Sequence, residues 1–161
     1  MQISKAMSDL MNAQIGNELG ASNQYLQLSA YFDGQALKKL AELFKKQAEE
    51  ERAHAMKFFD HLNEVGAPVN IPAIAAPKYD VASAEEAFKM AVDWEKEVTR
   101  QIYAMVDLSI KEKDYASQNF LQWFVAEQVE EVSSMETYLQ VLQQAGEKNL
   151  LMMEAYLSHG D

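Results

Sequence analysis

The 161-residue sequence has no cysteine and few cationic residues. Without cysteine the chain cannot form disulfides, thiolate metal sites or a catalytic thiol. It has 14 Lys and Arg residues against 25 Asp and Glu residues, which gives a net charge of −11. This charge argues against a nucleic-acid partner, because phosphate binding needs a basic surface, and it suits a protein that attracts cations.

Long apolar runs are also missing. The first residues, MQISKAMSDLMNAQIGNEL, place Asp9 and Glu18 where a signal peptide would be apolar. We therefore expect a cytoplasmic protein that has no membrane-spanning segment and no membrane partner. Because 48% of the residues are hydrophobic and 24% are charged, the chain fits one globular domain, residues 1–161, with a substantial core.

Proline is confined to one segment of the chain. Pro68, Pro72 and Pro77 all lie in GAPVNIPAIAAPKYDVAS, and the rest of the sequence is rich in helix-forming Ala, Leu, Met, Glu, Gln and Lys. We predict an all-α protein with one long link. The expected helices cover residues 4–32, 37–65, 84–111 and 115–145, followed by a short fifth helix over 148–158.

The lengths of the connections predict the arrangement of these helices. A helix of roughly 28 residues is about 40 Å long, and a link of roughly 18 residues spans up to about 60 Å. The proline-containing link can therefore run the length of the molecule, whereas the short turns at 33–34 and 112–114 must join antiparallel neighbours. The simplest topology is a four-helix bundle, residues 4–145, with a long crossover between its second and third helices. Ser83 and Asp114 are expected N-caps, and Gly66 and Gly146 are expected C-terminal stops.

One acidic residue interrupts the apolar face of each long helix. Residues seven apart on a helix lie within about 20° of each other, and Glu51 is the only acid in the row that contains Phe44 and Phe58. A single acid of this kind is often a residue at the edge of the buried face. However, when residues are counted from the turns, the four acids, one from each long helix, lie at the same height in the bundle to within about 3 Å. These four acids are Glu18, Glu51, Glu95 and Glu131.

Burying four ionised carboxylates together costs several kcal/mol each, so they must be protonated or neutralised by cations. His54 lies three residues after Glu51 on the same face, where one helix offers an oxygen and a nitrogen to one metal. An oxygen-rich site with one imidazole suits iron(II) or manganese better than copper or structural zinc. The fourth helix offers Gln128 and Glu131 in place of a second Glu-x-x-His, so a second metal should be held more loosely.

With these residues, the long crossover and the short fifth helix, the whole chain closely resembles the non-haem bacterial ferritins, which share the ferritin-like di-iron carboxylate fold. The resemblance implies an intra-subunit di-iron centre that has no haem. In it Glu18 and His54 would bind the first iron, Glu51 and Glu131 would bridge or share both, Glu95 would bind the second, and Gln128 would lie close to the second.

The resemblance implies roles for further residues outside the di-iron ligands. Tyr25 would lie beside the centre, where it either hydrogen-bonds a ligand or donates an electron, or else simply packs as a buried phenol. A third iron site would use Glu131 and three acids that could equally be solvated on the outer face of the bundle: Glu50, Glu127 and Glu130. Trp123 resembles an aromatic residue near that region. His61 and His159 are interpreted as structural or surface residues.

Related families of iron proteins differ from this sequence in their ligands or segments. Bacterioferritins carry a haem-ligating methionine where this chain has Arg52, and rubrerythrins add a cysteine-ligated iron domain. The miniferritins of starved cells lack the fifth helix and place their iron ligands between subunits. The sequence therefore fits the non-haem ferritins best among these relatives.

The implied function is iron storage with ferroxidase activity, in which Fe(II) is oxidised by O2 or peroxide and ferric oxyhydroxide mineral is deposited inside a protein cage. The implied assembly is a homo-oligomer of 24 subunits. The apolar fifth helix, NLLMMEAYL, would pack on symmetry mates, or alternatively cap the core of its own subunit. Two other functions stay open: iron binding without oxidation, and oxygenation of an organic substrate by a di-iron centre.

Overall fold

The computed structural model describes residues 3–160, and helices account for most of them. Four long helices are followed by a short 3-10 turn, η1 (Glu147–Asn149), and a final helix, α5 (Leu150–Ser158). The predicted all-α class is confirmed, and the predicted helix boundaries differ from the observed ones by at most two residues. The four long helices are α1 (Lys5–Asp33), α2 (Lys38–Glu64), α3 (Ala84–Glu112) and α4 (Tyr115–Ala145).

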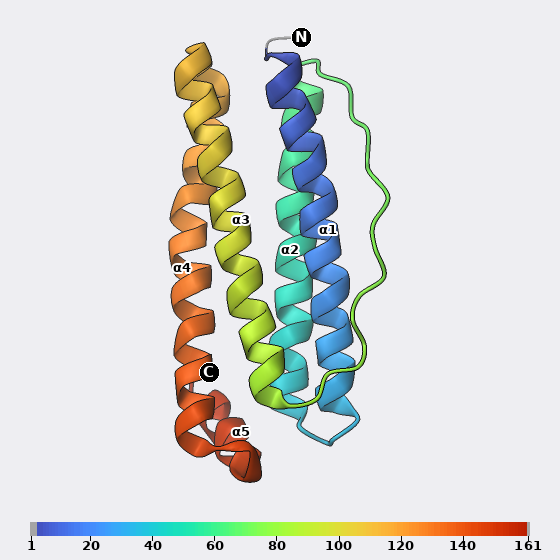
Figure 1. Ribbon diagram of the computed structural model, residues 1–161, viewed down its shortest axis with the longest axis vertical. Coiled ribbons are helices and arrows are strands. Elements are labelled where there is room, and N and C mark those ends of the chain that lie inside the picture. The colour runs from blue at the N-terminus through green and yellow to red at the C-terminus, as the bar shows by residue number, and fades with distance from the viewer. Residues whose placement is uncertain (1–2, 161) are drawn as a thin grey trace.

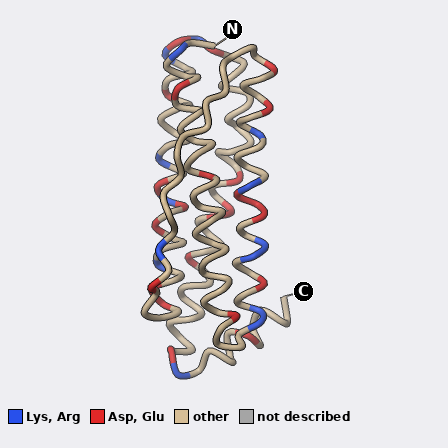
Figure 2. Tube along the Cα trace, turned by 90° about the vertical axis from the view of Figure 1, so that its right-hand side faces the viewer, with Lys and Arg blue, Asp and Glu red and all other residues tan. Residues whose placement is uncertain are grey.

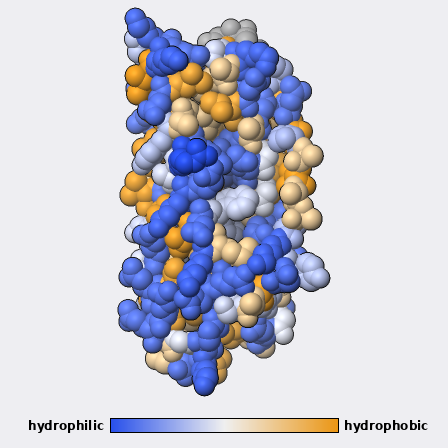
Figure 3. Space-filling view, viewed as in Figure 1, coloured by the Kyte–Doolittle hydropathy of each residue, from blue (hydrophilic) through white to orange (hydrophobic). Residues whose placement is uncertain are grey.

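The long helices form the predicted bundle, in which α1 lies along α2 and α3 lies along α4 (Figure 1). The crossover, residues 65–83, runs outside α1 from one end of the bundle to the other, and α5 folds across the end where α2 begins. Among residues 3–160, no helix combines the length and the apolarity needed to cross a bilayer. Hydrophilic side chains cover most of the face seen in Figure 3, with smaller apolar groups between them.

The helix ends follow the local sequence signals. The Ser83 hydroxyl accepts a hydrogen bond from the backbone N–H of Glu86 at 3.0 Å, and the Asp114 carboxylate caps α4 in the same way. Gly66 and Gly146 have φ angles of +69° and +81°, in the left-handed region that favours glycine. These residues end α2 and α4 as predicted.

Two amide side chains of α1 fix the crossover against the bundle. The Asn12 side chain donates to the carbonyl of Pro68 and accepts from the N–H of Asn70, at 2.9 and 2.6 Å. The Gln24 side chain pairs in the same way with both backbone groups of Lys78, at 2.9 and 2.8 Å. An extended segment without regular structure thus has its polar backbone satisfied near both ends.

The C-terminal segment caps the N-termini of two other helices. Both carboxylate oxygens of Glu154, on α5, accept hydrogen bonds from the backbone N–H groups of Lys39 and Leu40 at the start of α2. Glu147 accepts from the N–H of Glu85 at the start of α3. A carboxylate at a helix N-terminus satisfies unpaired donors and complements the helix dipole. These contacts hold α5 to the bundle.

The apolar core is divided into two clusters along the bundle. One lies toward the α5 end and includes Phe32, Phe44 and Phe88, and the other lies toward the opposite end and includes Phe58 and Phe124. Between Ala48 of the first cluster and Ala55 of the second, the buried residues of α2 are the polar Glu51 and His54. A polar layer therefore crosses the bundle at mid-height, where the sequence predicted four acids.

Candidate metal centre

Six polar side chains, contributed by all four long helices, form this buried layer. None is more than 7% exposed to solvent. Each acid sits on the apolar stripe of its helix, so the helix packing that buries the flanking aromatic and aliphatic residues buries it too. The six are Glu18 from α1, Glu51 and His54 from α2, Glu95 from α3, and Gln128 and Glu131 from α4.

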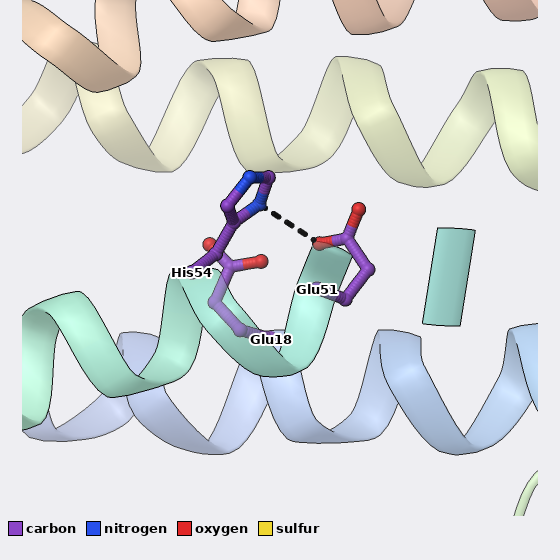
Figure 4. Close-up of side chains that lie close together, drawn as sticks. All are labelled: Glu18, Glu51 and His54. Atoms are coloured by element: carbon purple, nitrogen blue, oxygen red, sulfur yellow. Dashed lines mark ion pairs between the residues drawn. The ribbon is translucent and has the colours of Figure 1, made fainter. Parts of the chain in front are cut away.

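The first donor group consists of Glu18 from α1 and Glu51 and His54 from α2, and the three side chains point toward one another (Figure 4). One ligand atom from each lies within 4.8 Å of the others. His54 Nδ1 is 3.4 Å from Glu51 Oε2, which shows that the i, i+3 spacing brings both side chains to the same point. Two oxygens and one imidazole nitrogen are thus placed where one cation can contact all three.

The second donor group consists of Glu51, Glu95 and Glu131, and it shares Glu51 with the first. Gln128 lies beside it and donates a hydrogen bond to Glu95 Oε2 at 3.2 Å. The Tyr25 hydroxyl donates to the other oxygen of Glu95 at 2.5 Å. Glu95 is therefore oriented from two sides, and Tyr25 is both a buried phenol and a hydrogen-bonding neighbour of the site.

A third donor group joins His54, Glu127 and Glu131. His54 uses its other nitrogen here, with Nε2 lying 3.7 Å from Glu127 Oε1. Next to this group is a cavity of about 220 Å³, which we call the acidic cavity. Its walls include Gln47, Glu50, Glu127, Glu130 and Glu131. The structure thus brings the three acids expected for a third iron site to one cavity, where Glu50 and Glu127 are half-buried and Glu130 is exposed.

Burial controls the protonation of these acids. It raises the pKa of Glu18, Glu51 and Glu95, and it raises the pKa of Glu131 to about 7, with repulsion from Glu95 adding to the effect. Repulsion from Glu51 contributes at Glu18, and repulsion from Glu95 contributes at Glu51. Without a cation the layer therefore retains protons at neutral pH, and a divalent cation can replace them.

Glu18 carries the clearest sign of a role in binding a cation. Gln14 donates a hydrogen bond to Glu18 Oε1 at 2.9 Å, whereas Glu18 Oε2 is buried and has no hydrogen-bond partner. A buried carboxylate oxygen without a partner is costly unless it takes up a proton or binds a cation. The carboxylates and imidazole of this layer are the donor types that suit Fe(II).

Gln14 and Gln47 are supporting residues that the sequence reasoning did not identify. Each is a buried amide placed one helical turn before a buried acid, Gln14 before Glu18 and Gln47 before Glu51, and each donates to that acid. The sequence held a signal for them, since a glutamine four residues before an acid on the same face is within hydrogen-bonding reach.

The aromatic and histidine residues outside the layer occupy ordinary packing positions. Trp123 lies edge-on to His54, with ring centroids 5.4 Å apart, and Lys57 lies over its ring at 4.2 Å. His61 stacks on Phe120 at 4.0 Å, and burial lowers the pKa of His61. His159 is exposed after the end of α5.

Comparisons with known proteins agree with this geometry. Residues 8–145 match the family described as Ferritin-like domain. The chain is 38% identical over 145 residues to the bacterial non-heme ferritin of Staphylococcus aureus (strain USA300), covering 90% of this chain and 87% of that protein. The same kind of protein from Staphylococcus haemolyticus is 37% identical over the same shares.

Solved structures show the same relationship. An open pore ferritin from the archaeon Archaeoglobus fulgidus has a TM-score of 0.93 and 38% identity, with 98% of this chain and 97% of that chain covered. A humanized archaeal ferritin has a TM-score of 0.93 and 37% identity, with 97% of each chain covered. The chain with this four-helix layer of buried acids belongs to the ferritin family.

Proposed function

We propose that this protein is an iron-storage ferritin with ferroxidase activity. The observation that carries the proposal is the set of three overlapping donor groups inside one subunit, which together gather carboxylates and an imidazole in a buried layer. Iron is the substrate and the cargo of this reaction. The names of the bacterial relatives support storage by ferritin, and the donor chemistry supports Fe(II) as the ion that enters.

The proposed ligands follow the donor groups. Glu18 and His54 hold the first Fe(II), Glu95 holds the second, and Glu51 and Glu131 are shared between the two. Support for this assignment comes from Glu51 belonging to both the first and the second donor groups. Gln128 donates a hydrogen bond to Glu95 and so orients it, and the second position has no imidazole ligand, which is why we propose that it holds its ion more loosely than the first.

The chain's residues would handle protons while the substrate supplies electrons. Each Fe(II) gives one electron to O2, the reduced oxygen takes up protons, and the ferric product hydrolyses to oxyhydroxide with release of protons. The acids of the layer give up their protons when Fe(II) binds, because their raised pKa values belong to the metal-free state. The Tyr25 hydroxyl keeps Glu95 in place during the exchange.

The product's route is proposed from the charge of the acidic cavity. Glu50, Glu127 and Glu130 stand next to Glu131, and together they form a third iron position between the buried layer and the surface. Acidic residues are also spread along the length of the bundle (Figure 2), which suits a protein that collects cations and grows a ferric mineral.

The assembly and the location are further parts of the proposal. Leu151 and Met152 on α5 are 76% and 64% exposed, so these side chains are available to pack on other subunits of a 24-subunit cage. Met153 on the same helix is buried in its own subunit. We further propose that residues 1–161 form one domain, with residues 1, 2 and 161 outside the described part, and that the protein is cytoplasmic.

The ferroxidase proposal is tested by single-turnover oxidation of Fe(II). Metal-free protein is mixed with two Fe(II) per chain in aerated buffer, and ferric absorbance is followed by stopped flow. Glu51→Ala or His54→Ala should abolish the fast phase, because each removes a side chain that belongs to two of the three donor groups. Glu49→Ala is the matched control, since Glu49 lies on the exposed side of the same helix. An unchanged rate in both site variants would show that the reaction occurs elsewhere.

A further inference from the structure

Gln47 is a buried amide that contacts acids of two helices in the donor groups. Its side chain is only 6% exposed, and its amide nitrogen donates to Glu131 Oε2 at 2.6 Å and to Glu51 Oε1 at 3.2 Å. A primary amide nitrogen carries two hydrogens, so both are committed to these two carboxylates. Gln47 therefore fixes the orientation of one acid on α2 relative to one acid on α4.

The chemistry of the amide suits this position better than a charged group would. A lysine ammonium at the same place would neutralise the two carboxylates and compete with an incoming cation. The neutral amide orients both acids and leaves their charge available to the metal. Hydrogen bonds from neighbours that orient metal ligands commonly contribute roughly 10- to 100-fold to affinity.

The hydrogen bond from Gln47 matters most for Glu131, because Glu131 belongs to two donor groups. It belongs to the second donor group with Glu51 and Glu95, and also to the third donor group with His54 and Glu127. Gln47 and Glu131 both line the acidic cavity, so Gln47 stands at the boundary between the buried layer and that cavity. The bonds from Gln47 tie Glu131 to Glu51, which is on the side of the second group.

We propose that Gln47 is a positioning residue that retains Glu131 in the second donor group and so sets how this carboxylate is divided between the second metal position and the acidic cavity. The inference rests on the proposed function, since it assumes that these groups bind metal. Without the Gln47 amide, Glu131 is free to turn toward His54 and Glu127. The second metal position then weakens more than the first, because the shorter bond from Gln47, at 2.6 Å, goes to Glu131, whereas the longer one, at 3.2 Å, goes to Glu51, which both groups share.

The test uses Co(II) as a redox-inert probe of the assembled protein. Metal-free wild type and Gln47→Met are titrated anaerobically by calorimetry and by visible absorption, which reports the coordination of each Co(II). Methionine has a similar length and volume and no donor. Gln24→Met is the matched control, because Gln24 is also a buried amide with two hydrogen bonds but lies on the crossover side, away from the donor groups.

The expected result is a loss of roughly 10- to 100-fold in the second Co(II) affinity of Gln47→Met, with a changed absorption band for that ion and a smaller change in the first affinity. An unchanged second affinity would overturn the inference. Equal weakening of both affinities, or the same loss in Gln24→Met, would mark a general structural effect and would overturn it too. The proposed function fails separately, if the wild type neither binds Co(II) nor accelerates Fe(II) oxidation.

Discussion

Replacing Glu131 by Gln should stabilise the metal-free protein, although it removes a proposed ligand. Burial, together with repulsion from Glu95, raises the pKa of Glu131 from 4.5 to about 7. That difference corresponds to about 3 kcal/mol of unfavourable free energy in the folded state above pH 7. Glutamine removes the charge, keeps the shape, and still offers an oxygen to the amide of Gln47.

The direction in which the stability of the wild type changes with pH follows from proton linkage. The folded pKa of Glu131 lies above the unfolded value, so the folded protein binds more protons between about pH 4.5 and about pH 7. The free energy of unfolding therefore falls as the pH rises through this window and levels off above it. The raised pKa values of Glu18, Glu51 and Glu95 act in the same direction in the wild type.

Thermal unfolding of the metal-free wild type and of Glu131→Gln, at about pH 5 and about pH 8, measures the difference in stability between the two proteins. At the higher pH the Glu131→Gln variant should unfold about 6–12 °C above the wild type, on the scale expected for a chain of this size. At the lower pH the gap should shrink, because the wild-type carboxyl is then protonated. A variant that is less stable than the wild type at about pH 8 would refute the reasoning from buried charge.

Three other perturbations have defined outcomes. Glu154→Ala removes the carboxylate that caps α2 and should lower the free energy of unfolding by about 1 kcal/mol, and an unchanged denaturant midpoint would contradict this role. Gly16→Ala places a methyl group against the ring of Pro72, and the resulting shift of the crossover should lower the free energy of unfolding by about 1–3 kcal/mol. Hydrogen exchange of residues 70–78 can detect this shift, and unaltered exchange would argue against the contact. Binding of Co(II) near pH 6.5 should release protons, measured by pH-stat titration, and no release would mean that the buried acids are already ionised.

The fold and the main buried acids of the candidate site could be predicted from the sequence because they depend on local pattern and on length. The heptad rows on each helix identify Glu18, Glu51, Glu95 and Glu131, and helix geometry fixes their common height. The position of the crossover follows from the confinement of proline to one segment, and its path along the bundle follows from the length of that segment. His54 follows from its spacing to Glu51.

The contacts that orient those acids could not be predicted in the same way. The bond from Gln47 to Glu131 joins α2 to α4, and it depends on how far each helix is rotated about its own axis. The capping of α2 by Glu154 joins residues more than a hundred positions apart. Heptad patterns report which face of a helix is buried, and they carry no information about which polar atoms meet across the interface.

The central claim is that iron is oxidised in the buried layer and then moves on to a mineral. Metal-free wild-type protein should therefore be supplied with Fe(II) in large excess over two per chain in air, while O2 uptake and soluble Fe(III) are followed together. We predict oxidation faster than in buffer that continues well beyond two Fe(II) per chain, with the ferric product remaining in solution with the protein. Oxidation no faster than in buffer, or oxidation that stops at two Fe(II) per chain, would contradict the claim.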